Sequence, residues 1–100
     1  MSITTKSLWK GIVNSNSSIT LSEKYTNYDA IYTLTDLQNN GVYPNAFTYL
    51  TNYIPVDNNN YILAHIDGRF IIKFTTEDFK NLNFVEVQGT VKEIIGIKYC

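Results

Sequence analysis

The feature that most constrains this chain is a series of short strand-like runs that recur about every ten residues, between clusters of turn-forming residues. Each run is rich in β-branched and aromatic residues, and no long amphipathic helical pattern separates them. The runs cover residues 8–13, 19–21, 30–35, 42–55, 61–66, 69–74, 84–88 and 91–99. Strands without alternating helices do not build a parallel α/β fold. The spacing therefore predicts an all-β antiparallel β-sandwich, jelly-roll-like, with seven or eight short strands.

Composition supports strands joined by turns. The chain has twelve Ile, eleven Thr and eight Tyr, but only three Ala and one Met. Ile, Thr and Tyr suit a half-buried pleated surface, whereas the strong helix formers are scarce. Twelve Asn suit turns, because their side chains bond to nearby backbone groups. The composition thus favours the same fold class as the spacing.

The strongest hairpin signal is Asp67 and Gly68, which join residues 61–66 to residues 69–74. Strict alternation in the second arm gives it one inward and one outward face. The predicted inward residues are Phe70, Ile72 and Phe74, and the predicted outward residues are Arg69, Ile71 and Lys73.

The last run has the same alternation. Its two faces are Ile95, Ile97 and Tyr99 on one side, and Lys92, Ile94, Gly96 and Lys98 on the other. Large apolar side chains on such faces belong either to the core or to a subunit interface. The candidates for these two roles are Trp9, Tyr32, Phe70, Ile72, Phe74, Ile95, Ile97 and Tyr99.

Three further segments give local predictions. Residues 1–7 are polar and without core pattern, so we expect a flexible N-terminal arm that orders against a partner subunit, followed by a single domain over residues 8–100. Pro44 and Pro55 bracket residues 42–55, which places that strand at a sheet edge or in a crossing. Residues 76–79 are typical of one capped helical turn.

Charge and cysteine content exclude several classes of protein. Eight Lys and Arg balance nine Asp and Glu, and the net charge is −1 without any basic block. We therefore expect no binding to nucleic acid and no membrane insertion. Cys100 is the only cysteine, so an internal disulfide is impossible. The opening MSITTKSLWKG lacks an apolar run of signal-peptide length, which predicts synthesis in a cytoplasm.

Catalytic patterns are sparse. His65 is the only histidine, and no G-x-S-x-G, G-x-G-x-x-G or P-loop spacing accompanies it. The carboxylates available for paired acid–base chemistry are Glu77, Asp78, Glu86 and Glu93. Each is interpreted more simply as a turn or solvated-face residue. We predict a protein that is not an enzyme and that uses no cofactor and no metal, with an enzyme built on His65 or on a carboxylate pair as a competing hypothesis.

Tyrosine is the remaining chemical feature, because its ring offers both apolar contact and a hydroxyl. Four tyrosines flank turns and the proline-bracketed region. Tyr43, Tyr49, Tyr53 and Tyr61 are the candidate partner or glycan surface. They support the alternative of a stand-alone carbohydrate-binding module that uses exposed tyrosines.

Both ends of the chain resemble a known class of domain. The opening consists of Leu8-Trp9-Lys10-Gly11, Ile19-Thr20-Leu21-Ser22 and Asn27-Tyr28-Asp29-Ala30-Ile31, and the ending is Glu93-Ile94-Ile95-Gly96-Ile97-Lys98-Tyr99. This order is similar to that of small β-sandwich domains in the tail or head fibres and appendages of bacteriophages. Residues 38–60 carry no matching motif.

The resemblance implies a virion structural protein, made in the bacterial host cytoplasm, that attaches to the capsid or tail and can also contact a host surface glycan. It implies a homo-oligomer, with a trimer favoured, and other virion proteins as partners. It transfers no catalytic residue. Because the domain fills nearly the whole chain, a head or tail decoration protein is expected beside the fibre-tip role.

Overall fold

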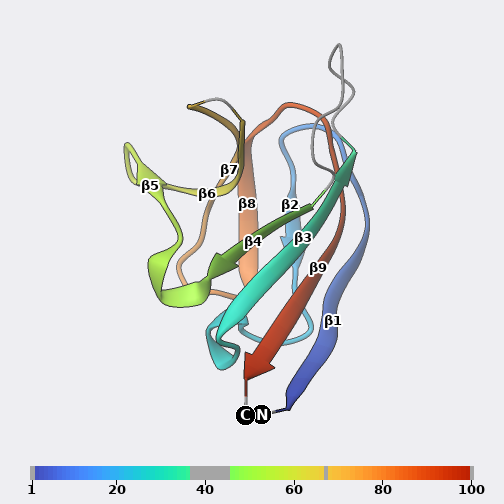
Figure 1. Ribbon diagram of the computed structural model, residues 1–100. Coiled ribbons are helices and arrows are strands. Elements are labelled where there is room, and N and C mark those ends of the chain that lie inside the picture. The colour runs from blue at the N-terminus through green and yellow to red at the C-terminus, as the bar shows by residue number, and fades with distance from the viewer. Residues whose placement is uncertain (1, 37–45, 67, 100) are drawn as a thin grey trace.

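The computed structural model describes residues 2–36, 46–66 and 68–99, and it consists of two antiparallel β-sheets packed face to face. Figure 1 shows the two layers, with the N- and C-terminal ends of the chain side by side at the lower end. The all-β antiparallel sandwich predicted from the spacing of the runs is confirmed.

The first sheet has four strands in the order β1-β9-β3-β4. These are β1 (Ile3–Val13), β9 (Thr90–Tyr99), β3 (Ala30–Asp36) and β4 (Ala46–Leu50). The first and last strands are direct neighbours, and their register begins with Ile3 opposite Tyr99. This pairing is what brings the two ends of the sandwich chain together.

The second sheet has five strands in the order β2-β8-β7-β6-β5. These are β2 (Ser18–Thr20), β8 (Asn81–Val87), β7 (Arg69–Thr75), β6 (Asn60–Ile66) and β5 (Val56–Asp57), and two 3-10 turns, η1 (Tyr25–Asn27) and η2 (Thr51–Tyr53), complete the described elements. The chain changes sheet four times, from β1 to β2, from β2 to β3, from β4 to β5 and from β8 to β9.

The described residues hold nine strands, one more than the seven or eight expected. The additional strand is β5, which is only two residues long and pairs with the start of β6. Asn58 and Asn59 connect the two strands, and both have positive φ (50° and 68°). Two such residues in succession are typical of a tight hairpin turn. The sequence pattern predicts this turn, but β5, with only two residues, is too short to show an alternation of its own.

The β6–β7 hairpin pairs up to Ile66 opposite Arg69, and Gly68 adopts a left-handed φ of 76°. Asp67 lies outside the described residues. The predicted alternation in β7 is partly wrong: Ile71 is buried beside Ile72, and Phe70 is only half-buried. The register shifts where β7 pairs with β6 and again where it pairs with β8. Such bulges break the two-residue period, so that consecutive side chains enter the core.

The strand β1 begins at Ile3, so residues 3–7, predicted as a flexible arm, are paired with β9. Their side chains are all exposed. An edge strand is held by its backbone hydrogen bonds, and these do not require apolar side chains. The polar composition of this segment therefore concealed a strand, and the domain boundary predicted at residue 8 is wrong by five residues.

The strand predicted over residues 42–55 is shorter in the structure. It covers Ala46–Leu50 and gives way to the 3-10 turn η2 before Pro55. Residues 42–45, including Tyr43 and Pro44, lie outside the described part. The strand-like spacing of Tyr49, Thr51 and Tyr53 thus extends past the end of β4, and Thr51 and Tyr53 belong to the turn η2.

The segment predicted as a capped helical turn forms a loop between β7 and β8 that is braced by side chains. Thr76 Oγ1 accepts the Phe79 N–H at 3.0 Å. Asp78 Oδ1 accepts the backbone N–H groups of Lys80 and Asn81 at 3.0 and 2.8 Å. Phe79 has a φ of 63°, which is incompatible with a right-handed helix. The loop therefore has the side-chain to backbone hydrogen bonds of a helix cap, but no helical turn follows them.

The braced loop predicts a loss of stability in acid. Hydrogen bonds from the backbone and side chain of Asn81, and from the backbone of Lys80, lower the pKa of Asp78 from its ordinary value of 3.8 to about 2. A carboxyl with a lowered folded-state pKa contributes stability above its unfolded pKa and loses it as the pH falls through the folded one. We expect the Tm to drop between pH 4 and pH 2 by less in Asp78→Ala than in the unchanged protein, by circular dichroism. The neighbouring variant Glu77→Ala serves as control and should retain the full drop. Equal drops in the unchanged protein and Asp78→Ala would contradict the assignment.

Phe74 lies at the centre of the core between the sheets and is fully buried, as is Ile72. The ring of Phe74 stacks on Tyr61 at a centroid distance of 5.5 Å and meets the edge of Tyr25 at 6.2 Å. Phe84 from β8 lies 6.3 Å away on a tilted plane. These four rings bring β6, β7, β8 and η1 into one packed cluster.

Candidate functional site

The four tyrosines predicted as a partner or glycan surface differ in their exposure. Tyr53 is 77 % exposed, the highest value among the exposed large apolar side chains. Tyr49 is half-buried, its hydroxyl contacts Nδ1 of His65, and burial raises its pKa to about 12. Tyr61 is half-buried against Phe74. Tyr43 lies outside the described residues, so Tyr53 is the one described member with a largely open ring.

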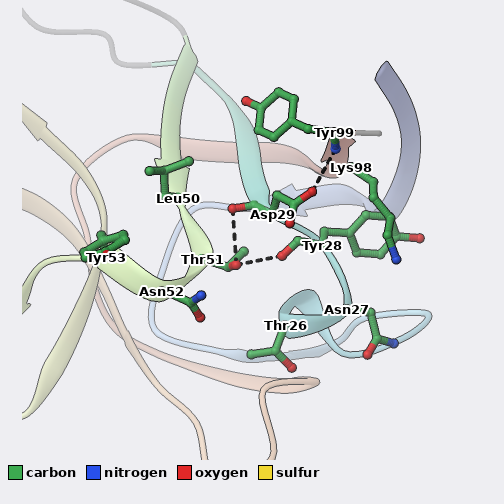
Figure 2. Close-up of a pocket in the computed structure, with 10 residues that line it drawn as sticks. All are labelled: Thr26, Asn27, Tyr28, Asp29, Leu50, Thr51, Asn52, Tyr53, Lys98 and Tyr99. Carbon is green, nitrogen blue, oxygen red and sulfur yellow. Dashed lines mark hydrogen bonds between the residues drawn. The ribbon is translucent and has the colours of Figure 1, made fainter. Parts of the chain in front are cut away.

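Tyr53 borders a hollow of about 470 Å³ at the end of the sandwich where β9 stops. Two other tyrosines, Tyr28 and Tyr99, line the same hollow (Figure 2). Tyr28 is not among the four tyrosines predicted for this role, because in the sequence it lies far from the proline-bracketed region. The topology, not a motif, brings it next to the end of β9.

The outer face of the five-stranded sheet is polar and its groups bond to one another. Ser18 Oγ donates to Asn83 Oδ1 at 2.9 Å, and Thr20 Oγ1 donates to Asn81 Oδ1 at 2.7 Å. These two pairs link β2 to β8 directly opposite one another. A face of this kind is stable in water without a covering layer.

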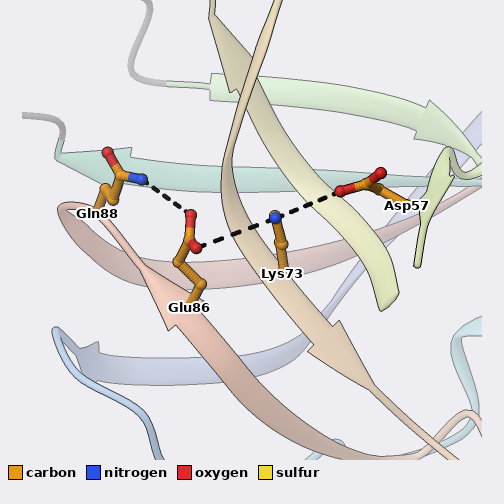
Figure 3. Close-up of polar contacts among 4 residues, drawn as sticks. All are labelled: Asp57, Lys73, Glu86 and Gln88. Atoms are coloured by element: carbon orange, nitrogen blue, oxygen red, sulfur yellow. Dashed lines mark hydrogen bonds and ion pairs between the residues drawn. The ribbon is translucent and has the colours of Figure 1, made fainter. Parts of the chain in front are cut away.

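An ionic row continues the same sheet (Figure 3). The ammonium group of Lys73 on β7 lies 3.4 Å from a carboxylate oxygen of Asp57 and 4.0 Å from one of Glu86. Gln88 Nε2 donates to the other oxygen of Glu86 at 2.8 Å. Each charge has a partner within the sheet, so this row is explained by the fold alone.

The outer face of the four-stranded sheet combines a strip of apolar side chains with polar ones, among them Thr5, Ser7, Thr48 and Glu93. We define it as the positions that point away from the core along β1, β9, β3 and β4. Its apolar members are Ile3, Ala30, Tyr32, Leu34, Ala46, Leu50, Ile95, Ile97 and Tyr99. Ile97 is flanked by Thr5 and Ala30, and Ile95 by Ser7 and Tyr32. Adjacent strands thus place these side chains next to one another in one continuous patch.

Apart from the fully buried Ala30, the members of this patch are accessible to solvent. Ile3 is 58 % exposed, Leu50 49 % and Tyr99 42 %, and Ile95 and Ile97 are half-buried. Among residues 2–36, 46–66 and 68–99, the elements form two sheet layers and two short turns, and no third layer is among them. The two outer faces of the sandwich therefore differ: one is satisfied by its own polar contacts, and one presents apolar side chains.

The sequence left open whether its apolar candidates belong to the core or to a subunit interface. The structure places Ile72 and Phe74 in the core, with Trp9 packed against its margin. It places Tyr32, Ile95, Ile97 and Tyr99 on the outer face, because Val91 and Ile94 take the inward positions of β9. Five apolar members of the outer face were missed. They are Ile3, Ala30, Leu34, Ala46 and Leu50. Ala30 and Leu34 flank Tyr32 at the two-residue spacing of a strand and could have been found.

The candidate catalytic groups do not form a shared centre in the described structure. His65 is engaged by Tyr49. Glu86 and Glu93 lie on different sheets, each pointing to an outer face, and Asp78 braces the β7–β8 loop. Within residues 2–36, 46–66 and 68–99 no three His, Cys, Asp or Glu side chains are close enough to hold a metal ion. The outer face is thus the feature with the clearest functional meaning.

The helical turns in the described ranges are too short to cross a membrane. No model of a known protein family and no curated protein matches this sequence.

Proposed function

We propose that this chain is a non-enzymatic structural protein of a phage virion, a fibre, appendage or decoration component that self-associates through the outer face of its four-stranded sheet. The observation that carries the proposal is the contrast between the two outer faces. A free monomer gains no stability from exposing a strip of Ile, Leu and Tyr on one face. The other outer face, in contrast, carries polar side chains that bond to one another.

The size of the outer face supports an interface. Four strands about 4.8 Å apart and about seven residues long, at about 3.3 Å each, cover roughly 450 Å² of sheet. That is within the range of the largest patches on monomeric proteins, which are often functional. Two copies in contact would bury roughly 900 Å² by this projected measure, close to the lower limit for specific interfaces. The occupant to which we commit is a second copy of this chain.

The net charge of −1 also favours self-association, because copies of nearly neutral chains repel one another little. The resemblance to phage fibre domains favours three copies. In that arrangement the four-stranded sheets turn toward a common threefold axis, and the polar five-stranded sheets face water. The loops and the far end of the sandwich then remain available to contact the capsid, the tail or a host surface.

The variant Ile95→Lys tests the outer face. Ile95 lies in the middle of the patch between Ser7 and Tyr32, so a lysine there would bring a charge into the interface between copies, where burial is costly even with Glu93 two positions away on the same face. We expect light scattering to give about 35 kDa for the unchanged protein, three copies of the 11.5 kDa chain, and the mass of one chain for Ile95→Lys.

The matched control is Asn83→Lys, which adds the same charge to the polar outer face and should leave the mass unchanged. A monomer for the unchanged protein across micromolar to millimolar concentration would overturn self-association. An oligomer that survives Ile95→Lys would assign assembly to another surface. A dimer that Ile95→Lys dissociates would keep the outer face as the interface, but it would contradict the threefold symmetry.

The virion assignment has its own test, which does not depend on symmetry. Immunogold labelling of purified phage particles should place the protein on the head or tail. A protein found only in the soluble fraction of infected cells, with unlabelled particles, would contradict the assignment.

A further inference from the structure

The hollow bordered by Tyr53 has the chemistry of a binding site that the assembly proposal does not use. Ten residues line its volume of about 470 Å³, which lies within the range of small-molecule sites. They are Thr26, Asn27, Tyr28, Asp29, Leu50, Thr51, Asn52, Tyr53, Lys98 and Tyr99. Figure 2 shows side chains from three separate parts of the chain around it.

Hydrogen bonds fix the walls of the hollow in place. Thr51 Oγ1 donates to the backbone carbonyl of Tyr28 at 2.6 Å, and the Thr51 N–H donates to that of Asp29 at 3.0 Å. The Tyr99 N–H donates to Asp29 Oδ2 at 2.8 Å. Asp29 thus ties the start of β3 to η2 and to the end of β9 (Figure 2). A site held in this way requires little ordering when a ligand binds.

One wall is also fixed from beneath. The ring of Tyr28 packs so closely on Gly96 that a Cβ at that glycine would lie 2.6 Å from Cγ of the ring. The position of Tyr28 is therefore set by β9, while the 77 % exposed ring of Tyr53 stays accessible at another part of the rim. The hollow combines a fixed aromatic wall with an open one.

The polar groups of the lining indicate the class of ligand. Nine of the ten lining side chains carry a hydroxyl, amide, carboxylate or ammonium group, and Leu50 is the exception. Asp29 and Lys98 carry opposite charges, so the lining favours a neutral ligand over phosphate or a cation. Asn52 supplies both a donor and an acceptor, and among the described residues Asp29 Oδ1 has no hydrogen-bond partner.

We propose that this hollow binds one pyranose ring of a neutral saccharide. A pyranose has an apolar C–H face that packs on an aromatic ring and a rim of hydroxyls that bond to amide and carboxylate groups. Tyr53 provides the ring surface, and the neighbouring Asn52 provides a donor and an acceptor for the hydroxyls. The proposal does not rest on assembly, although Leu50 and Tyr99 also belong to the margin of the outer face.

The test is a titration of ¹⁵N-labelled protein, observed by NMR, with glucose, galactose, mannose and N-acetylglucosamine in turn, each up to 100 mM. A single sugar ring in a shallow site supports a dissociation constant on the order of 1–10 mM. We expect at least one of the four sugars to give saturable shifts that centre on the amides of Asn52 and Tyr53.

Four variants identify the groups responsible. Tyr53→Ala and Asn52→Ala should each weaken binding about tenfold or more, since both remove a direct contact. Tyr53→Phe retains the ring and should bind nearly as well as the unchanged protein, and Asn83→Ala on the polar outer face should bind equally well. Tyr53 and Asn52 are exposed, so dispersed spectra should show that these variants fold.

Two results would overturn the saccharide site: no saturable shift with any of the four sugars at 100 mM, or binding that is unaffected by both Tyr53→Ala and Asn52→Ala. Light scattering on Tyr53→Ala tests whether a loss of sugar binding is accompanied by a loss of self-association. Its mass should equal that of the unchanged protein, so sugar binding and self-association can fail independently.

Discussion

Phe74→Ala should lower the free energy of unfolding by about 3–5 kcal/mol, the range for removing a fully buried aromatic ring. Phe74 is inaccessible to solvent and contacts Tyr25, Tyr61 and Phe84. Its removal leaves a cavity surrounded by these rings, which belong to three different elements and cannot all move inward together. Because a domain of this size is stable by only about 5–15 kcal/mol, the loss takes a large share of the total.

Urea unfolding followed by the fluorescence of Trp9 measures this effect, and Phe70→Ala is the matched control on the same strand. Phe70 is only half-buried, so its replacement should cost clearly less. If Phe74→Ala does not fold at all, Phe74→Leu should still fold with a smaller loss. Equal losses for Phe70→Ala and Phe74→Ala would show that the centre of the core lies elsewhere.

Gly96→Ala should lower the free energy of unfolding by about 1–3 kcal/mol, the usual cost of overpacking. The new methyl group would lie 2.6, 2.7 and 2.8 Å from Cγ, Cδ2 and Cδ1 of Tyr28. These atoms form the base of the ring, so a rotation of the ring does not remove the clash. The backbone of Tyr28 is tied to Tyr25 and Thr51, which restricts its retreat.

Gly11→Ala is the matched control for this glycine. A methyl group there would approach Cζ2 of Trp9 at a similar distance of 2.8 Å, but Gly11 is exposed and the contact is with the outer part of the indole ring. We expect a smaller loss, because that ring can shift toward solvent. Thermal unfolding of both variants compares the two losses of stability. A Gly96→Ala protein as stable as the unchanged one would show that Tyr28 is free to move.

The fold class could be predicted from the sequence because it depends on local patterns. Turn residues between short apolar runs are visible without knowing which strand pairs with which, as the hairpin ending at Ile66 and Arg69 shows. The extent of β1 could not be predicted in this way. Residues 4–7 are polar, and the strand that they form with Ile3 exists only because β9, about ninety residues later, offers a backbone partner.

The candidate site shows the same division. The alternation of Ile95, Ile97 and Tyr99 correctly placed them on one face, but alternation alone does not say which face is inward. That choice depends on the second sheet, against which Ile94 and Val91 pack. The hollow was beyond prediction altogether, since Tyr28, Tyr53 and Tyr99 are separated by long stretches of chain and meet only through the topology.

The pairing of Ile3 with Tyr99 also determines how the domain responds to mechanical force. A pull applied to both ends of the chain would separate β1 from β9 from one end, and their hydrogen bonds would break one after another instead of sharing the load. Antiparallel end strands of this kind make a weak link in a series of domains under tension. The same geometry is well suited to a domain attached at a single pole, where the load passes into its support and the core of the sandwich carries none of it.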